Sequence, residues 1–193
     1  METKLFYQVI IDKCKPTTTN SQESNKILKS TWIDSPLGPI LVISDENGLY
    51  LLEFVERRGL EKEIKNLIIN LKASIIPGRT SAIDLIELEL AEYFASNLKE
   101  FKTPIHLLGT PFQKMVWEEL IRIPYGETRS YITQAKAINK PKGYRAVANA
   151  NGANQLAIII PCHRIINSNG NLGGYGGGIQ LKKWLLEHEK KSN

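Results

Sequence analysis

The sequence contains few of the side chains that bind metals or form disulfides. Its 193 residues include 2 cysteines, Cys14 and Cys162, and 3 histidines, His106, His163 and His188. No Cys-x-x-Cys or His-Glu-x-x-His spacing occurs, so a tetrahedral zinc site lacks its ligands. A disulfide between Cys14 and Cys162 is not expected in a reducing compartment. We therefore expect two thiols and no bound metal.

Long apolar runs are also missing. Stretches such as Ile158 to Pro161 are far shorter than the roughly 20 residues that a membrane-spanning helix needs. Residues 1–12 have an acidic residue at position 2 and no apolar core followed by small residues, which argues against a secretory signal. We expect a globular protein without membrane contact, located in the cytoplasm, or in the nucleus if the host is a eukaryote.

Acidic residues are scarce in one part of the chain. The formal net charge is +5 and the sequence pI is about 9.1, which favours an anionic partner, although a modest lysine excess also occurs on surfaces that bind nothing. Between positions 122 and 164 the only acidic residue is Glu127, against these basic residues: Arg122, Arg129, Lys136, Lys140, Lys142, Arg145 and Arg164. The distribution favours nucleic acid as the partner of this region.

The first half of the chain alternates between strand and helix patterns. Residues 12–30 are polar and rich in Ser, Thr and Asn, so we expect residues 1–30 to be a flexible leader. Residues 31–34, 40–44 and 49–55 read as strands joined by turns, and they predict a small antiparallel sheet. Apolar residues recur at helical spacing from Leu60 to Leu71 and from Ile83 to Phe94. Residues 31–108 are therefore expected to form an N-terminal α/β domain.

The second half, residues 109–193, reads as mainly helical. Thr110 can cap a helix with Pro111 at its first position, and the expected buried side chains are Phe112, Val116, Trp117, Leu120 and Ile121. Thr128 or Ser130 opens a second helix through Ile138, and Pro141 opens a third through Asn151. Together they predict a helix-turn-helix, which presents a helix to DNA. The expected fold class is α+β.

A cysteine stands in a reactive context where an apolar segment ends. Pro161-Cys162-His163-Arg164 follows Ile158-Ile159-Ile160. A thiol reacts as thiolate, and cationic neighbours lower its pKa, whereas an apolar setting raises it. Taken alone, a cysteine beside three isoleucines is most often a small buried hydrophobe. The residues around it favour a nucleophile.

Several blocks accompany this motif in a fixed order: Tyr144 to Asn154 before it, then Gly173 to Gly178 and Lys183 to Glu189 after it. Phe112, Trp117 and Ile123-Pro124-Tyr125-Gly126-Glu127-Thr128 precede them. In this order the blocks closely resemble the O6-alkylguanine-DNA alkyltransferase (methylated-DNA–protein-cysteine methyltransferase) family. The resemblance runs from about Thr31 to Glu189 and is densest from Thr110 onward.

The resemblance implies a role for each matching residue. Cys162 attacks the alkyl carbon, His163 acts as its base, Glu189 orients His163, and Asn154 braces the turn that holds the cysteine. Arg145 fills the gap that the flipped base leaves, with Ala146, Ala148 and Asn151 beside it on the helix that meets DNA. Tyr131 crowds the flanking phosphate and offers its hydroxyl to the base. Tyr175 and Gly176 form a lid on the base pocket, which Ile165 also lines. Many relatives have serine where this chain has Gly176. Some relatives carry a structural zinc, for which this chain offers only Cys14 and His106.

The resemblance also implies the activity and the partners. We expect direct transfer of an alkyl group from O6-alkylguanine in double-stranded DNA to Cys162, once per molecule, by a monomer that needs no cofactor. Activity on O4-alkylthymine is left open. The main alternative is a non-enzymatic, alkyltransferase-like protein that marks damaged bases, although such relatives replace the nucleophile. A cysteine hydrolase is a second alternative, but adjacent residues seldom supply both nucleophile and base.

Overall fold

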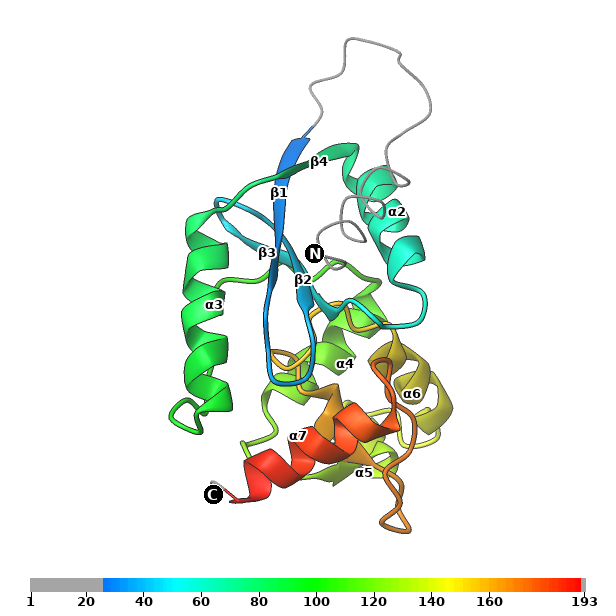
Figure 1. The fold of residues 1–193 in the computed structure, drawn as a ribbon. Coiled ribbons are helices and arrows are strands. Elements are labelled where there is room, and N and C mark those ends of the chain that lie inside the picture. The colour runs from blue at the N-terminus through cyan, green and yellow to red at the C-terminus, as the bar shows by residue number, and fades with distance from the viewer. Residues whose placement is uncertain (1–25, 192–193) are drawn as a thin grey trace.

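The computed structural model describes residues 26–191. Its N-terminal half contains β1 (Lys26–Ile33), β2 (Ile40–Asp45), β3 (Gly48–Phe54), α2 (Leu60–Leu71), β4 (Ala73–Pro77) and α3 (Ser81–Phe94). The strands form one sheet in the order β3-β2-β1-β4 (Figure 1). β1, β2 and β3 are antiparallel as predicted.

The sheet is mixed, however, because β4 pairs in parallel with β1. The expectation of an antiparallel sheet was incomplete, since α2 carries the chain back across the sheet before β4 begins. β1 also starts within the expected leader, and Leu28 and Ser30 of that stretch are buried. The rest of the expected leader, residues 1–25, lies outside the described residues.

The apolar run of β2 is buried on both faces of the sheet. Ile40 and Val42 belong to a core shared with α3 and the C-terminal half, whereas Leu41 and Ile43 belong to a core under α2. This alternation follows from the period of two in a strand. The core that contains Ile40 and Val42 therefore runs from the sheet into the C-terminal half.

The C-terminal half is mainly helical, as predicted. It contains α4 (Pro111–Ile121), β5 (Arg129–Ser130), α5 (Tyr131–Ala137), α6 (Tyr144–Gly152), the 3₁₀ helix η1 (Cys162–Arg164), β6 (Ile165–Ile166) and α7 (Ile179–Lys191). Thr110 caps α4 and forms a capping box with Gln113. Ser130 caps α5.

Three details of these helices differ from the prediction. α6 begins at Tyr144 and not at Pro141, because residues 140–143 form a turn first. Phe112 is only half-buried and Ile121 is exposed, so the buried stripe of α4 consists of Val116, Trp117 and Leu120. α5 and α6 nevertheless pack as a helix-turn-helix, with α4 against α6.

The edge of β3 connects the two halves at two points. Leu49 pairs with Ile105, which lies between α3 and α4, and Leu52 pairs with Leu156. The Leu52 amide donates to Gln155 O at 2.9 Å, and the Ala157 amide donates to Leu52 O at 2.7 Å. The sheet is thus hydrogen-bonded directly to the segment that precedes Cys162. Among residues 26–191, no helix is long and apolar enough to cross a membrane.

Candidate active site

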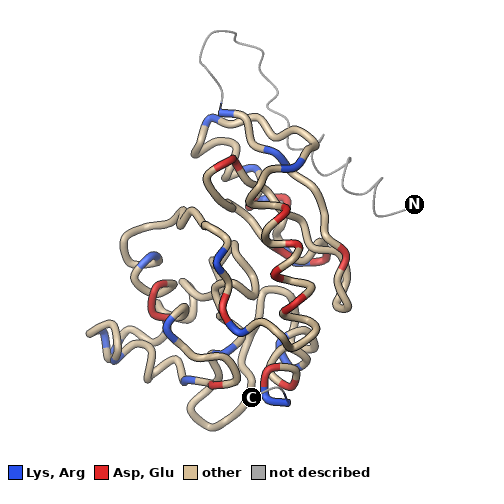
Figure 2. Tube along the Cα trace, turned by 90° about the vertical axis from the view of Figure 1, so that its left-hand side faces the viewer, with Lys and Arg blue, Asp and Glu red and all other residues tan. Residues whose placement is uncertain are grey.

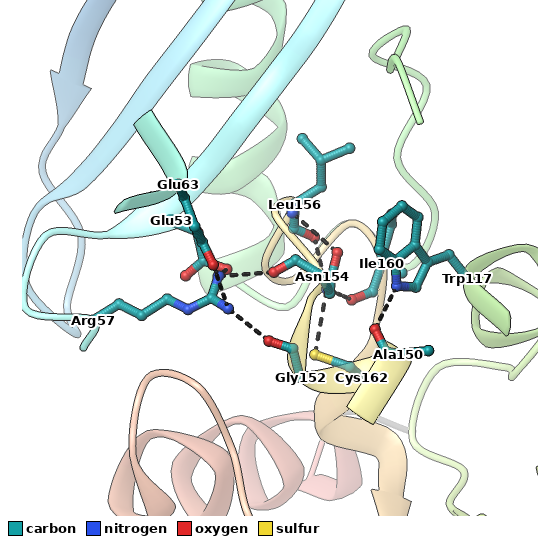
Figure 3. Close-up of polar contacts among 10 residues, drawn as sticks. All are labelled: Glu53, Arg57, Glu63, Trp117, Ala150, Gly152, Asn154, Leu156, Ile160 and Cys162. Carbon is teal, nitrogen blue, oxygen red and sulfur yellow. Dashed lines mark hydrogen bonds and ion pairs between the residues drawn. The ribbon is translucent and has the colours of Figure 1, made fainter. Parts of the chain in front are cut away.

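Cys162 begins η1 at the end of a tight turn, residues 155–161, and is half-buried. Ile158 in this turn has φ +69°, a backbone conformation that a β-branched residue rarely adopts. Asn154 spans the turn, since its Nδ2 donates to Ile160 O at 2.9 Å and its Oδ1 accepts from the Leu156 amide at 3.0 Å. Its Nδ2 also lies 3.3 Å from Sγ of Cys162 (Figure 3). Asn154 therefore fixes both the turn and the thiol.

The environment of Cys162 favours the neutral thiol. Burial raises the pKa of Cys162 to about 11 and outweighs the hydrogen bond from Asn154, which lowers it. The charge of Glu53 raises this pKa further, whereas Arg57 and Lys182 lower it. The sequence-based expectation that adjacent cations activate the thiol needs correction, because Arg164 is paired elsewhere. Reaction near neutral pH therefore requires a group that removes the proton.

Glu189 is fully buried and links two residues that follow the cysteine. Its Oε1 lies 2.8 Å from Nε2 of His163. Arg164 donates to Oε2 through Nε at 2.9 Å and to Oε1 through Nη2 at 3.0 Å. Tyr93 and the Gly126 amide also donate to this carboxylate. Burial opposes its ionisation, but the hydrogen bonds and charges of His163 and Arg164 bring the pKa of Glu189 below its usual range. An ionised carboxylate thus orients His163.

His163 keeps one ring nitrogen available. Nε2 faces Glu189, while Nδ1 is buried without a hydrogen-bond partner among residues 26–191. Burial lowers the pKa of His163, against the opposing effect of Glu189, so the imidazole is neutral at physiological pH. A neutral imidazole with a free nitrogen can accept the Cys162 proton, directly or through a water molecule.

Glu189 lies at the centre of the buried face of α7 and not at its border. The buried residues of this helix are Lys182, Leu185 and Glu189, whereas Leu181, Trp184 and His188 are half-buried. The sequence pattern missed Lys182. Its Nζ donates to Ile165 O and, at 3.3 Å, to Gly174 O, and burial lowers its pKa to about 8. Lys182 stands three positions before Leu185 and seven before Glu189, and this helical spacing places the three residues on one face.

α6 presents the residues expected to meet DNA. Arg145 and Ala146 are exposed and Ala148 is half-buried, whereas Val147 and Ala150 face the core. Asn151, expected among the DNA contacts, is buried instead. Its amide and that of Gln134 bond reciprocally, at 2.8 and 3.2 Å, and hold α6 against α5. Asn151 thus packs within the helix-turn-helix core, and its contribution to DNA binding stays a prediction.

The glycine-rich segment packs against the residues near the thiol. A Cβ at Gly173 would lie 3.3 Å from the Tyr131 hydroxyl, and burial together with Cys162 raises the pKa of Tyr131. The Tyr175 hydroxyl is buried without a partner among the described residues, and its ring meets His163 edge to face. Ile165 is fully buried, and β6 joins it to Arg129 of β5. Tyr131 and Tyr175 therefore lie close enough to Cys162 to couple with it electrostatically, while Gly176 lies against Arg57.

The basic residues between positions 122 and 164 lie partly on the surface and partly in the core. Figure 2 shows Lys and Arg in both halves of the molecule, interspersed with Asp and Glu. Arg164 is buried and Arg129 is paired with Glu127 at 2.6 Å. The exposed cations of the helix-turn-helix are Lys136, Lys140, Lys142 and Arg145. Exposed cations of this kind are the side chains that neutralise phosphates in proteins that bind DNA.

The fold and the site define a helix-turn-helix protein with a cysteine next to a buried His–Glu pair, and the comparisons with known proteins identify its family. The model described as 6-O-methylguanine DNA methyltransferase, DNA binding domain, matches residues 111–191, and the model of the ribonuclease-like domain of the same protein matches residues 28–107. The chain belongs to the 6-O-methylguanine DNA methyltransferase family.

Relatives cover most of the chain. A methylated-DNA–protein-cysteine methyltransferase of Methanosarcina barkeri is 42% identical over 160 residues, which are 83% of this chain and 96% of that protein. One of Mycobacterium bovis is 45% identical over 159 residues, 82% of this chain and 90% of that protein. The crystal structure of Mycobacterium tuberculosis OGT in complex with DNA has a TM-score of 0.74 and 40% identity, and covers 86% of this chain and 94% of that one.

Proposed function

We propose that this protein repairs DNA by moving the alkyl group of an O6-alkylguanine onto Sγ of Cys162. The observation that carries the proposal is the placement of an intact cysteine. The Asn154-braced turn, which follows α6, holds Cys162 beside the His163–Glu189 pair. Family membership and the relatives' names support the same reaction.

The chemistry is a direct displacement. His163 takes the proton of Cys162, Sγ forms a bond to the alkyl carbon, and the bond between that carbon and O6 breaks. The electron pair leaves with guanine, which needs hydrogen-bond donors to accommodate the charge. The hydroxyls of Tyr131 and Tyr175 lie near the thiol and are suited to this task. The product thioether has no route back to a thiol, so each molecule acts once, and no cofactor takes part.

The base must leave the duplex before Sγ can reach it. α6 offers small residues, Ala146 and Ala148, that allow close approach to a groove, and the exposed Arg145 can occupy the gap left by the flipped base. The partner is therefore double-stranded DNA that contains O6-alkylguanine, bound by a monomer.

The alternative, a protein that marks damage without transferring the alkyl group, is disfavoured because the nucleophile and its base are both in place. The decisive test is incubation with duplex DNA carrying radiolabelled O6-methylguanine. We expect label on Cys162, at a limit of one methyl group per molecule, in the wild type and in a Cys14→Ser control. Binding without transfer, label on Cys14, or many turnovers per molecule would reject the proposal.

A further inference from the structure

A buried arginine joins the N-terminal sheet to the turn that carries Cys162 (Figure 3). Arg57 follows β3 in the loop before α2 and is only 7% exposed. Its Nη1 donates to Asn154 O at 2.8 Å, and its Nη2 donates to Gly152 O at 2.9 Å. Gly152 is the last residue of α6, where carbonyl groups lack helical partners and attract a cation. Arg57 thus contacts both the end of the DNA-facing helix and the residue that bonds Sγ.

Two carboxyl groups from separate elements fix the guanidinium. Glu53 of β3 lies 2.5 Å from Nη1, and Glu63 of α2 lies 2.9 Å from Nη2. Burial raises the pKa of Glu53 to about 8 and that of Glu63 to about 6, against the opposing charge of Arg57.

Arg57 also faces the glycine-rich segment. Its Nε is buried and has no partner among the described residues. A Cβ at Gly176 would lie 2.8 Å from this Nε and 3.2 Å from Cζ, closer than van der Waals contact allows. Because both Nη atoms are already bonded, the guanidinium cannot move aside as a free side chain would. Glycine at position 176 and arginine at position 57 are therefore sterically matched.

We propose that Arg57 is a positioning residue for alkyl transfer, which holds the Cys162 turn, the end of α6 and the Gly176 segment in one arrangement. The inference rests on the proposed function. Through its hydrogen bond to Asn154 O, Arg57 fixes the residue that orients Sγ, and the charge of Arg57 favours the thiolate of Cys162. Through Gly152 O it connects the thiol to the helix that meets DNA.

The first test compares Arg57→Met and Arg57→Lys with Arg58→Met, an exposed neighbour, all in a Cys14→Ser background. The measurements are the rate of Cys162 alkylation by O6-benzylguanine and by iodoacetamide from pH 6 to 10, together with thermal unfolding and affinity for undamaged duplex. For Arg57→Met we expect a rate about tenfold lower near neutral pH per folded molecule, and an alkaline limb shifted upward by about one unit, because a cation near the thiol is lost. Arg57→Lys should recover part of the rate, and Arg58→Met should match the wild type.

A wild-type rate and pH profile for folded Arg57→Met, even with lower stability, would overturn the inference and leave Arg57 a purely structural residue. Failure of the wild type to take up methyl label from O6-methylguanine in duplex DNA would instead reject the proposed function. The iodoacetamide profile would then still decide whether Arg57 controls the thiol.

A second test examines the match between Arg57 and Gly176. Gly176→Ser should slow alkylation in the wild-type background, because its Cβ meets the fixed guanidinium, and should have little effect in an Arg57→Ala background. Gly174→Ser is the matched control, since a Cβ there meets nothing within 4 Å. Equal losses from Gly176→Ser in both backgrounds, or none in the wild type, would overturn this contact. The absence of a loss in the wild-type background would overturn the contact even if Arg57→Ala does not fold.

Discussion

Nδ2 of Asn154 lies 3.3 Å from Sγ of Cys162, and the same amide group bonds both ends of the turn between them. The turn contains the left-handed Ile158, a conformation that costs on the order of 1–3 kcal/mol and persists only when its surroundings hold it. The position of the nucleophile therefore depends largely on one side chain.

Asn154→Ala should accordingly impair both folding and reaction. We expect a loss of about 1–3 kcal/mol in the free energy of unfolding, because buried backbone groups of the turn lose their partner. Alkylation of Cys162 per folded molecule should also fall, since Sγ loses its hydrogen bond. Urea unfolding and the O6-benzylguanine rate measure the two effects, and Asn66→Ala on the exposed side of α2 is the control. A destabilised variant with an unchanged rate would confine Asn154 to a structural role.

The pH dependence of the free thiol follows from its burial. With the pKa of Cys162 at about 11, the thiolate fraction, and hence the rate with iodoacetamide, should rise about tenfold per pH unit from pH 7 to 10 without a plateau. The measurement uses Cys14→Ser protein without DNA, with circular dichroism to verify folding at each pH. A plateau near neutral pH would mean that His163 already holds the proton in the free protein.

Arg145 is exposed on α6 and should act on the duplex, not on the chemistry. We expect Arg145→Ala to slow repair of O6-methylguanine in duplex DNA by at least about tenfold and to leave the reaction with free O6-benzylguanine nearly unchanged, since only the duplex requires flipping. Lys142→Ala, which removes an exposed cation just before the same helix, should weaken DNA affinity and its salt dependence without a comparable loss of repair at saturating DNA. Equal losses on both substrates for Arg145→Ala would place it in the pocket or the core.

Glu53 should make stability fall as pH rises. Its folded pKa, about 8, is above the value of 4.5 for an unperturbed glutamate, so the folded state binds more protons between these values and loses stability as pH rises through them. Glu53→Gln removes this titration. The difference in free energy of unfolding, wild type minus variant, should therefore decrease by more than about 1 kcal/mol from pH 5 to pH 8. Urea unfolding at both pH values measures it, and a constant difference would mean that Arg57 keeps Glu53 ionised.

The sequence predicted those parts of the fold in which local signals agree. Alternation and turns predicted β1 to β3, and apolar periodicity with the Thr110 and Ser130 caps predicted the helices. β4 was missed, because a five-residue strand that ends in Pro77 carries little local signal and its partner, β1, is distant in the chain.

The site was predictable where its residues share one motif and not where tertiary contacts assemble it. Cys162, His163 and Asn154 lie within one short stretch. Arg57 reaches Asn154 across 97 positions, and a solvated arginine after a strand is the ordinary expectation. On α7, two of the three buried residues are charged, so the pattern of apolar residues did not predict which face of the helix is buried.

The last prediction concerns Glu189, which serves His163 and Arg164 at once. Glu189→Gln removes the charge that supports a cationic imidazole, so transfer of the Cys162 proton to His163 becomes less favourable. Alkylation by O6-benzylguanine near neutral pH should fall and should recover in part as pH rises, when hydroxide can replace the base. The substitution also leaves buried Arg164 without a counter-ion, so we expect about 3 kcal/mol of lost stability.

The pKa of the Glu189 carboxylate is depressed, so its stabilising effect is present above about pH 4 to 5 and is lost as pH falls toward the folded pKa. The free energies of unfolding of wild type and variant should therefore converge in acid. Glu187→Gln, an exposed neighbour on the same helix, is the control. An unchanged pH profile per folded molecule would show that Glu189 holds Arg164 and α7 in place but takes no part in activating the thiol.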